Sequence, residues 1–127
     1  MTIAETFAVF TAGAAGYGLI EILWRGRTHW SMLITGGLCF LFMYIIANFS
    51  HMQFWKQILL SAAVVTTLEF LCGIVVNLHF GWAVWDYSDM PGNILGQICP
   101  AFSIGWLLLS IPAMPLCRGM KNLISLL

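Results

Sequence analysis

The sequence predicts an all-α integral membrane protein, a bundle of four transmembrane helices that forms a single domain over residues 1–127. Hydrophobic residues make up 61% of the chain and charged residues only 8%, whereas a soluble domain carries about 25% charged residues. Four apolar stretches each approach the roughly 20 residues that cross a bilayer as a helix. The lipid bilayer is the expected partner, and the zero net charge without any basic run excludes nucleic acid.

Small residues dominate the first predicted helix, which runs from Ile3 to Trp24. No Lys or Arg precedes its apolar run, so we expect a retained helix rather than a cleaved signal peptide. Small residues recur four apart, at Ala12 and Gly16 and at Ala14 and Gly18. Such pairs let another helix approach closely, because no side chain holds the backbones apart.

Polar residues on the same helix give a first candidate site. Tyr17 and Glu21 lie four apart on one face, and Glu21 can also pair with Arg25 a further four residues on. Two interpretations of Glu21 stay open at this point: an ion pair at the membrane surface, or part of a binding site.

The second helix is predicted from Ser31 to Phe49, after a basic loop that ends in Trp30. Basic and aromatic residues of this kind gather at membrane interfaces. Within the helix, Tyr44 and Asn48 share a face, and either side chain can donate a hydrogen bond to an acid on a neighbouring helix.

The third helix holds the strongest candidate, Glu69, in an apolar run from Ile58 to Val76. A central acid opposes insertion by about 2.5–3.5 kcal/mol, while the eleven Leu, Ile, Val and Phe residues of the run favour it by roughly 5 kcal/mol. The segment therefore inserts, but Glu69 must be protonated, paired or in contact with water. Either it binds a proton or cation, or it fixes helix packing through a hydrogen bond from Tyr17, Tyr44 or Asn48.

A stripe of small and polar residues follows the same helix, which we extend to about Leu78. In lipid, this pattern predicts that the stripe faces protein or a wet cavity. The stripe consists of Ala62, Thr66, Glu69, Gly73 and Asn77.

The connection between the third and fourth helices is rich in aromatic residues, of which Trp85 and Tyr87 suit the headgroup region. Asp86 either binds a cation or caps backbone donors of the loop, and Asn93 is expected to cap the fourth helix. This aromatic WDYS loop is predicted to be ordered and to fold over the ends of the third and fourth helices as a lid.

The fourth helix is predicted from Asn93 to Ala113, with Pro100 inside it as a potential kink. The remaining tail carries Arg118 and Lys121 and is expected to lie along the membrane surface.

The chain lacks the sequence motifs of several common functional sites. The chain has no G-x-x-x-x-G-K-[ST], so it cannot itself bind ATP in a phosphate-binding loop, and no G-x-S-x-G or H-E-x-x-H occurs. His29 and His79 match no zinc-ligand spacing, and the four cysteines form no C-x-x-C pair. We therefore predict no cofactor and no metal site.

One long motif begins as Glu69-x-x-x-Gly73 and continues as Trp85-Asp86-Tyr87-Ser88-x-x-Pro91-x-Asn93-x-x-Gly96-x-Ile98 and Phe102-Ser103-Ile104-x-Trp106. With Gly18-x-x-Glu21 in the first helix, it resembles the putative ABC-transporter type IV family, the CmpB-like membrane proteins. The resemblance implies four helices, a permease-like role and importance of the Glu69 and WDYS positions. The chain departs from the family pattern at residues 32–37, where no proline enters the second helix.

The sequence thus favours a small multi-pass membrane protein that moves a small solute or ion, as a transporter or permease-like component. Its candidate binding residues are Glu69, Glu21, Tyr17, Tyr44, Asn48, Asp86 and Asn93. Two alternatives stay open: a membrane enzyme that acts on lipid through Glu69, Asp86 and His79, and a non-catalytic subunit or scaffold.

Four helices can hardly enclose a solute pathway and also pack against one another, so we expect a homodimer with the first helix near the interface. Lys56, Arg118 and Lys121 fall on the side of both termini, against Arg25 and Arg27 on the other side. This small excess predicts a multi-pass protein of the cell membrane with both termini in the cytoplasm.

Overall fold

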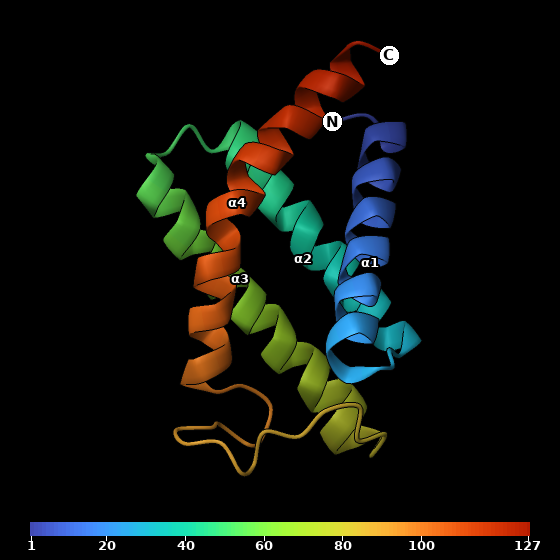
Figure 1. Cartoon of the computed structure of the whole chain (residues 1–127), viewed down its shortest axis with the longest axis vertical. Coiled ribbons are helices and arrows are strands. Elements are labelled where there is room, and N and C mark those ends of the chain that lie inside the picture. The colour runs from blue at the N-terminus through green and yellow to red at the C-terminus, as the bar shows by residue number, and fades with distance from the viewer.

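The computed structural model describes residues 1–127 as a bundle of four long helices (Figure 1). The helices are α1 (Ile3–Arg25), α2 (Trp30–Phe49), α3 (Phe54–Gly73) and α4 (Pro100–Ser125), and a π-helical segment, η1 (Ile74–His79), continues α3. All four spans are long and apolar enough to cross a membrane. The predicted all-α, four-helix membrane architecture is therefore confirmed.

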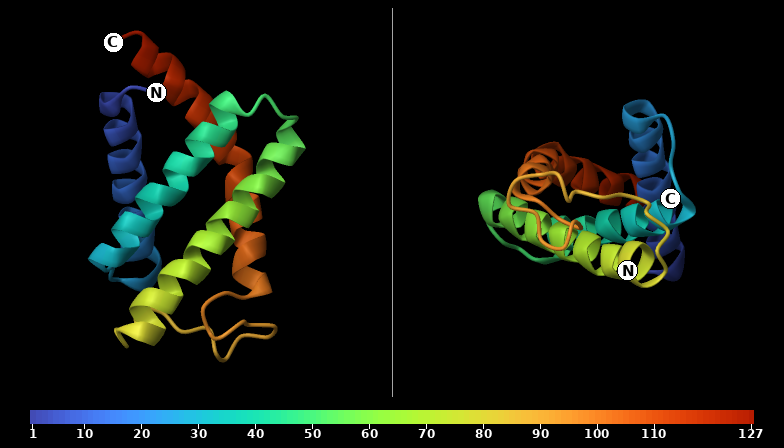
Figure 2. Two further views of the ribbon diagram at one scale, coloured as in Figure 1. Left: turned by 180° about the vertical axis from the view of Figure 1, so that it is seen from behind. Right: turned by 90° about the horizontal axis from the view of Figure 1, so that it is seen from below.

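The central helix is α2, which packs against α1, α3 and α4. Both chain termini and the connection 50–53 lie at one end of the bundle, which we call the terminal end (Figure 1). The connections 26–29 and 80–99 lie at the other end, the loop end. Figure 2 shows α2 and α3 running side by side, with the connection 80–99 lying across the loop end.

Glycines allow α1 and α2 to pack closely. A Cβ atom at Gly36 would lie 2.5 Å from the Tyr17 Cβ, and one at Gly18 would lie 2.5 Å from the Leu33 Cδ2. A Cβ at Gly16, by contrast, would meet nothing within 4 Å. One of the two small-residue faces of α1 is thus used inside the chain, and the face that carries Gly16 is left open. Homodimerisation through α1 stays a prediction.

The fourth helix begins at Pro100, so the predicted start at Asn93 is wrong. The residues before it form turns instead, because Leu95 and Gly96 adopt positive φ angles of 55° and 73° that a helix does not allow. Pro100 consequently sits in the first turn of α4, where a missing N–H leaves no helical hydrogen bond unmade, and it causes no kink.

The bend of α4 lies elsewhere. Pro112 and Pro115 stand inside the helix, and Figure 1 shows α4 changing direction along its length, as interior prolines cause. The stretch after Ala113, expected as a surface tail, continues this helix. Its residues Met114 and Cys117 are fully buried.

The aromatic loop is tied to the end of α3 through Asn77. The Asn77 Oδ1 accepts a hydrogen bond from the Val84 backbone N–H (2.7 Å), and its Nδ2 donates to Gln97 Oε1 (2.8 Å). The Trp85 indole is buried and donates to the Gln97 carbonyl oxygen (3.0 Å). The small and polar stripe of the third helix therefore faces protein, as its composition predicted.

Candidate functional site

The strongest sequence candidate, Glu69, meets two residues of α1 at the loop end. Glu69 is 4% exposed and Glu21 is 6% exposed. The Tyr17 hydroxyl donates a hydrogen bond to Glu21 Oε1 (3.1 Å), and Glu69 lies close enough to both residues for its charge to act on them. Three of the seven predicted binding residues are thus brought together from two helices.

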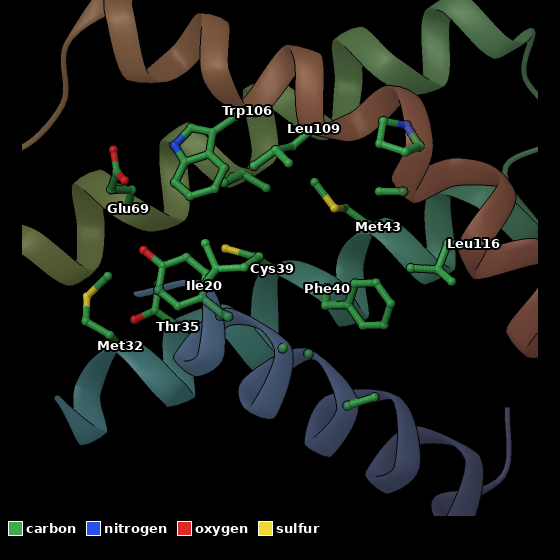
Figure 3. Close-up of a pocket in the computed structure, with 18 of the residues that line it drawn as sticks. Ile20, Met32, Thr35, Cys39, Phe40, Met43, Glu69, Trp106, Leu109 and Leu116 are labelled. Atoms are coloured by element: carbon green, nitrogen blue, oxygen red, sulfur yellow. The ribbon is translucent and has the colours of Figure 1, made fainter. Parts of the chain in front are cut away.

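Two hydrogen-bond donors lie next to the Glu69 carboxylate, the Trp106 indole and the Tyr87 hydroxyl. Trp106 Nε1 is buried and makes no hydrogen bond of normal geometry, and Figure 3 shows the indole nitrogen on the side of the ring that faces Glu69. A buried donor without a partner is unusual in a folded protein and calls for an explanation. This Trp–Glu contact is positioned to change when Glu69 gains or loses a ligand.

Charge at the loop end is only partly balanced. The Arg25 guanidinium lies 3.4 Å from Glu21 Oε2 and also donates to the Val84 carbonyl oxygen (2.8 Å). The other ion pair of the chain joins Lys121 to Glu5. Glu69 belongs to neither pair, so its charge has no basic partner within the chain.

A cavity of about 370 Å³ begins at Glu69 and extends between the helices (Figure 3). Glu69, Trp106 and Thr35 lie toward one end of it, whereas Phe40 and Leu116 lie toward the other. Most of its lining is apolar. Ligand sites typically combine such apolar walls with a few polar groups at defined positions.

A second cavity of about 120 Å³ opens at the loop end, lined by Glu21, Arg25 and His29 among others. Met32 lines both cavities. The hydrogen-bonded pair of Glu21 and Tyr17 therefore stands between a polar cavity among the loops and the apolar cavity that contains Glu69.

Tyr44 and Asn48, expected as partners of Glu69, bind other groups, and that expectation is wrong. The Tyr44 hydroxyl donates to Glu5 Oε1 (3.2 Å), and Asn48 Nδ2 donates to the carbonyl oxygens of Tyr44 (3.0 Å) and Cys117 (3.1 Å). The reason is distance along α2. Tyr44 lies nine residues beyond Thr35, and at about 1.5 Å per residue this places it more than two turns nearer the terminal end.

Asp86 and Asn93 lie in the loop and organise its turns. Asp86 Oδ1 accepts a hydrogen bond from the Ser88 backbone N–H (2.9 Å), and this bond lowers the pKa of the Asp86 carboxyl from its ordinary value. Asn93 Oδ1 accepts from the Gly96 N–H (3.0 Å). The arrangement matches the capping alternative for Asp86, and the helix that Asn93 was expected to cap begins seven residues later.

The histidines take part in aromatic contacts at the loop end. The His29 ring lies 5.7 Å from the Trp82 ring, and the His79 ring lies 4.9 Å from the Phe80 ring. No group of three or more His, Cys, Asp or Glu side chains in the chain could hold a metal ion.

Sequence reasoning missed Trp106 as a neighbour of Glu69. Thr66 and Ser103 hydroxyls lie 3.1 Å apart and set the register of the antiparallel helices α3 and α4. Side chains lean toward the N-terminus of their own helix, so Glu69 and Trp106, each three residues after these hydroxyls, lean toward each other. Trp106 did appear in the family-like motif, which was the only sequence signal for it.

Comparison with known proteins identifies the family to which the chain belongs. No curated protein and no solved structure matches the chain. The family model described as "Putative ABC-transporter type IV" matches residues 8–125, which include all four helices except the first five residues of α1. The chain therefore belongs to the putative ABC-transporter type IV family of membrane proteins.

Proposed function

We propose that this chain is a transporter or permease-like component that moves a small solute or ion, with Glu69 as the acid that binds a proton or cation. The observation that carries the proposal is a buried carboxylate, without a basic partner, at one end of a cavity inside four membrane-spanning helices. Acidic residues within membrane-spanning helices are costly and usually functional.

Access to Glu69 from water supports this role. The loop-end cavity reaches Glu21, the Tyr17 hydroxyl donates to Glu21, and Glu69 lies beyond them at the apolar cavity. A proton from the loop-end cavity would bind Glu21, and the Tyr17 hydroxyl would then turn, give its own proton to Glu69 and take the proton of Glu21 in exchange. The unpartnered Trp106 indole and the Tyr87 hydroxyl would then stabilise Glu69 when its proton leaves.

The lipid-enzyme alternative is not favoured by any geometric observation, because His79 packs against Phe80 and Asp86 is exposed and caps a turn. ATP-driven transport would need a separate ATPase subunit, since the chain lacks a phosphate-binding loop. We further propose a location in the cell membrane with both termini in the cytoplasm, on the basis of Lys56, Arg118 and Lys121 at the terminal end.

Proton flux into liposomes tests the proposal. Purified protein is reconstituted with a pH-sensitive dye inside, and flux is followed after a pH jump with a potassium–valinomycin clamp. Wild type is expected to conduct protons or to couple them to an added cation, and Glu69→Gln is expected to fall to the level of empty liposomes, because the amide keeps the shape and cannot ionise.

Glu5→Gln is the matched control, because Glu5 is an equally buried glutamate at the terminal end with partners of its own. It is expected to retain flux. Normal flux by Glu69→Gln, or equal losses in both variants, would leave Glu69 with a packing role and would overturn the proposal.

A further inference from the structure

The apolar cavity is open on one side, between α1 and α4. Its wall includes Gly16 and Ile20 of α1 and Leu109 and Leu116 of α4, and these residues are exposed on the surface of the chain. The main packing of α1 is on α2, and that of α4 is on α3 and α2. Where no second copy covers it, this side of the bundle would face the acyl chains of a membrane rather than water, and a homodimer formed through the Gly16 face would close it.

One contact between α1 and α4 closes the opening at each of its two ends. At the terminal end, Lys121 of α4 lies 3.6 Å from Glu5 of α1. At the loop end, the Tyr17 and Trp106 rings lie 6.1 Å apart. The cavity therefore has a side window between two contacts, and Glu69 lines the cavity at its loop-end side.

The polar end of the cavity carries a negative charge at Glu69, and the donors beside that charge, Trp106 Nε1 and the Tyr87 hydroxyl, are neutral. The Tyr17 hydroxyl already donates to Glu21, and the Thr35 hydroxyl already donates to the Ser31 carbonyl oxygen (2.8 Å). Glu69 has no basic partner. Neutral donors do not neutralise a carboxylate, so a ligand with a positive charge is favoured at this end, whereas an anionic lipid or fatty acid would be repelled by Glu69.

Aromatic rings add to the preference for a cation. Tyr17 and Trp106 both line the cavity beside Glu69, and an organic ammonium group is attracted to the faces of such rings as well as to a carboxylate. The rest of the cavity, about 370 Å³ in total, falls within the range of small-molecule sites and offers apolar walls to an alkyl or aryl portion.

Resting on the proposed function, we propose that the substrate class of this site is amphipathic organic cations, which enter from the membrane between α1 and α4. The ammonium group binds beside Glu69, against the parts of the Tyr17 and Trp106 rings that line the cavity. The apolar portion lies along the cavity toward Phe40 and Leu116 (Figure 3).

Equilibrium binding of radiolabelled dodecyltrimethylammonium to the full chain in neutral-lipid nanodiscs tests this inference, with empty nanodiscs subtracted. Wild type is expected to show saturable binding at one site per chain. Dodecanol, which is neutral, and dodecyl sulfate, which is anionic, should fail to compete. Glu69→Gln should weaken binding by roughly 30-fold or more, since it removes one partner of a desolvated charge pair, and Glu5→Gln should not.

A second pair of variants tests the cavity itself. Gly16→Leu adds a side chain to the cavity wall at a position where a Cβ meets nothing, so the chain should fold. Gly105→Leu makes the same change at an equally open position outside the lining. Binding of dodecyltrimethylammonium should be lost in Gly16→Leu and retained in Gly105→Leu.

Three results of the binding experiments would overturn the inference. These are the absence of saturable binding, competition by dodecanol as strong as that by the cation, and unchanged binding in Gly16→Leu. Efficient crosslinking between Gly16→Cys chains in native membranes would also overturn it, because a second copy would then cover the window. Loss of flux in Glu69→Gln without any binding of the cation would leave the proposed function standing and reject this substrate class alone.

Discussion

The two ends of the bundle each bury a glutamate of similar exposure, but they treat it differently. At the terminal end, Glu5 accepts a hydrogen bond from Tyr44 and pairs with Lys121. At the loop end, Glu69 has no ion-pair partner, and the neighbouring Trp106 Nε1 has no hydrogen-bond partner. The charge of Glu5 has a basic partner within the chain, whereas Glu69 has only the neutral donors Trp106 and Tyr87 beside it.

Gln57 and Glu21 show the same difference between the two ends in their hydrogen bonding. Gln57 at the terminal end donates to the Ile46 carbonyl oxygen (3.1 Å) and to Ser50 Oγ (3.2 Å), and it accepts a hydrogen bond from Arg118. Glu21 at the loop end leaves Oε2 without a hydrogen bond, although Arg25 is near. Saturated polar clusters rigidify a fold, whereas unsatisfied ones are expensive and persist where function needs them. We therefore interpret the polar cluster at the terminal end as structural and propose the loop end as the functional site.

The largest expected effect on stability comes from the saturated cluster. Gln57→Leu removes the acceptor of Arg118 and the donor to the last turn of α2, and it should lower the free energy of unfolding by about 2–3 kcal/mol, because buried polar partners are left unpaired. Unfolding in mixed micelles followed by circular dichroism measures this loss. A change below 1 kcal/mol would mean that water replaces Gln57 and that the cluster is not structural.

At the loop end, we expect removal of a polar side chain to leave the free energy of unfolding unchanged or to raise it. Glu69→Leu should leave the free energy of unfolding unchanged or raise it by about 1–3 kcal/mol, because it removes an acid that the membrane disfavours. Proton flux should disappear in the same variant. Glu5→Leu is the control and should destabilise, since it leaves Lys121 and the Tyr44 hydroxyl without their partner. Aggregation of Glu69→Leu would assign Glu69 a structural hydrogen bond.

Substitutions at two adjacent glycines of α2 test whether Tyr17 takes part in proton flux. Gly36→Ala would place a Cβ 2.5 Å from the Tyr17 Cβ, and Gly37→Ala would place one 2.7 Å from the Phe10 ring. Both should destabilise by about 1–2 kcal/mol through overpacking. Only Gly36→Ala should also reduce proton flux, because it displaces Tyr17. Similar flux in the two variants at matched folded fractions would contradict a role for Tyr17.

The smallest effect concerns the loop. Its backbone amides from Trp85 to Asn93 should exchange more slowly than those of the last residues of the chain, because Trp85 and Asn93 are anchored by hydrogen bonds. Hydrogen exchange followed by mass spectrometry measures this difference. Exchange as fast as at the C-terminus would show that the loop is not an ordered lid.

The same loop should loosen at acidic pH. The Ser88 N–H lowers the pKa of Asp86 in the folded loop. The ionised carboxylate therefore stabilises the folded loop at pH values above the unfolded pKa of about 4, and this stabilisation is lost as the pH falls through the folded pKa. Asp86→Asn should reduce this pH dependence of amide protection, and Asp89→Asn, exposed in the same loop, should leave it intact.

The sequence by itself determined the membrane class, the four spans and the importance assigned to Glu69. These follow from local properties: apolar runs long enough for a bilayer, and one acid whose solvation cost is visible in the run that contains it. The small-residue faces of α1 were also readable, because close approach between membrane helices requires small side chains.

Only the tertiary structure decided which polar residues meet. Tyr44 and Glu69 were plausible partners by helix position, yet the register of α2 against α1 places the Tyr44 hydroxyl beside Glu5. Trp106 reaches Glu69 because α3 and α4 run antiparallel in the register set by Thr66 and Ser103. Periodicity fixes the face on which a side chain lies, but the height at which it meets another helix depends on how the helices pack.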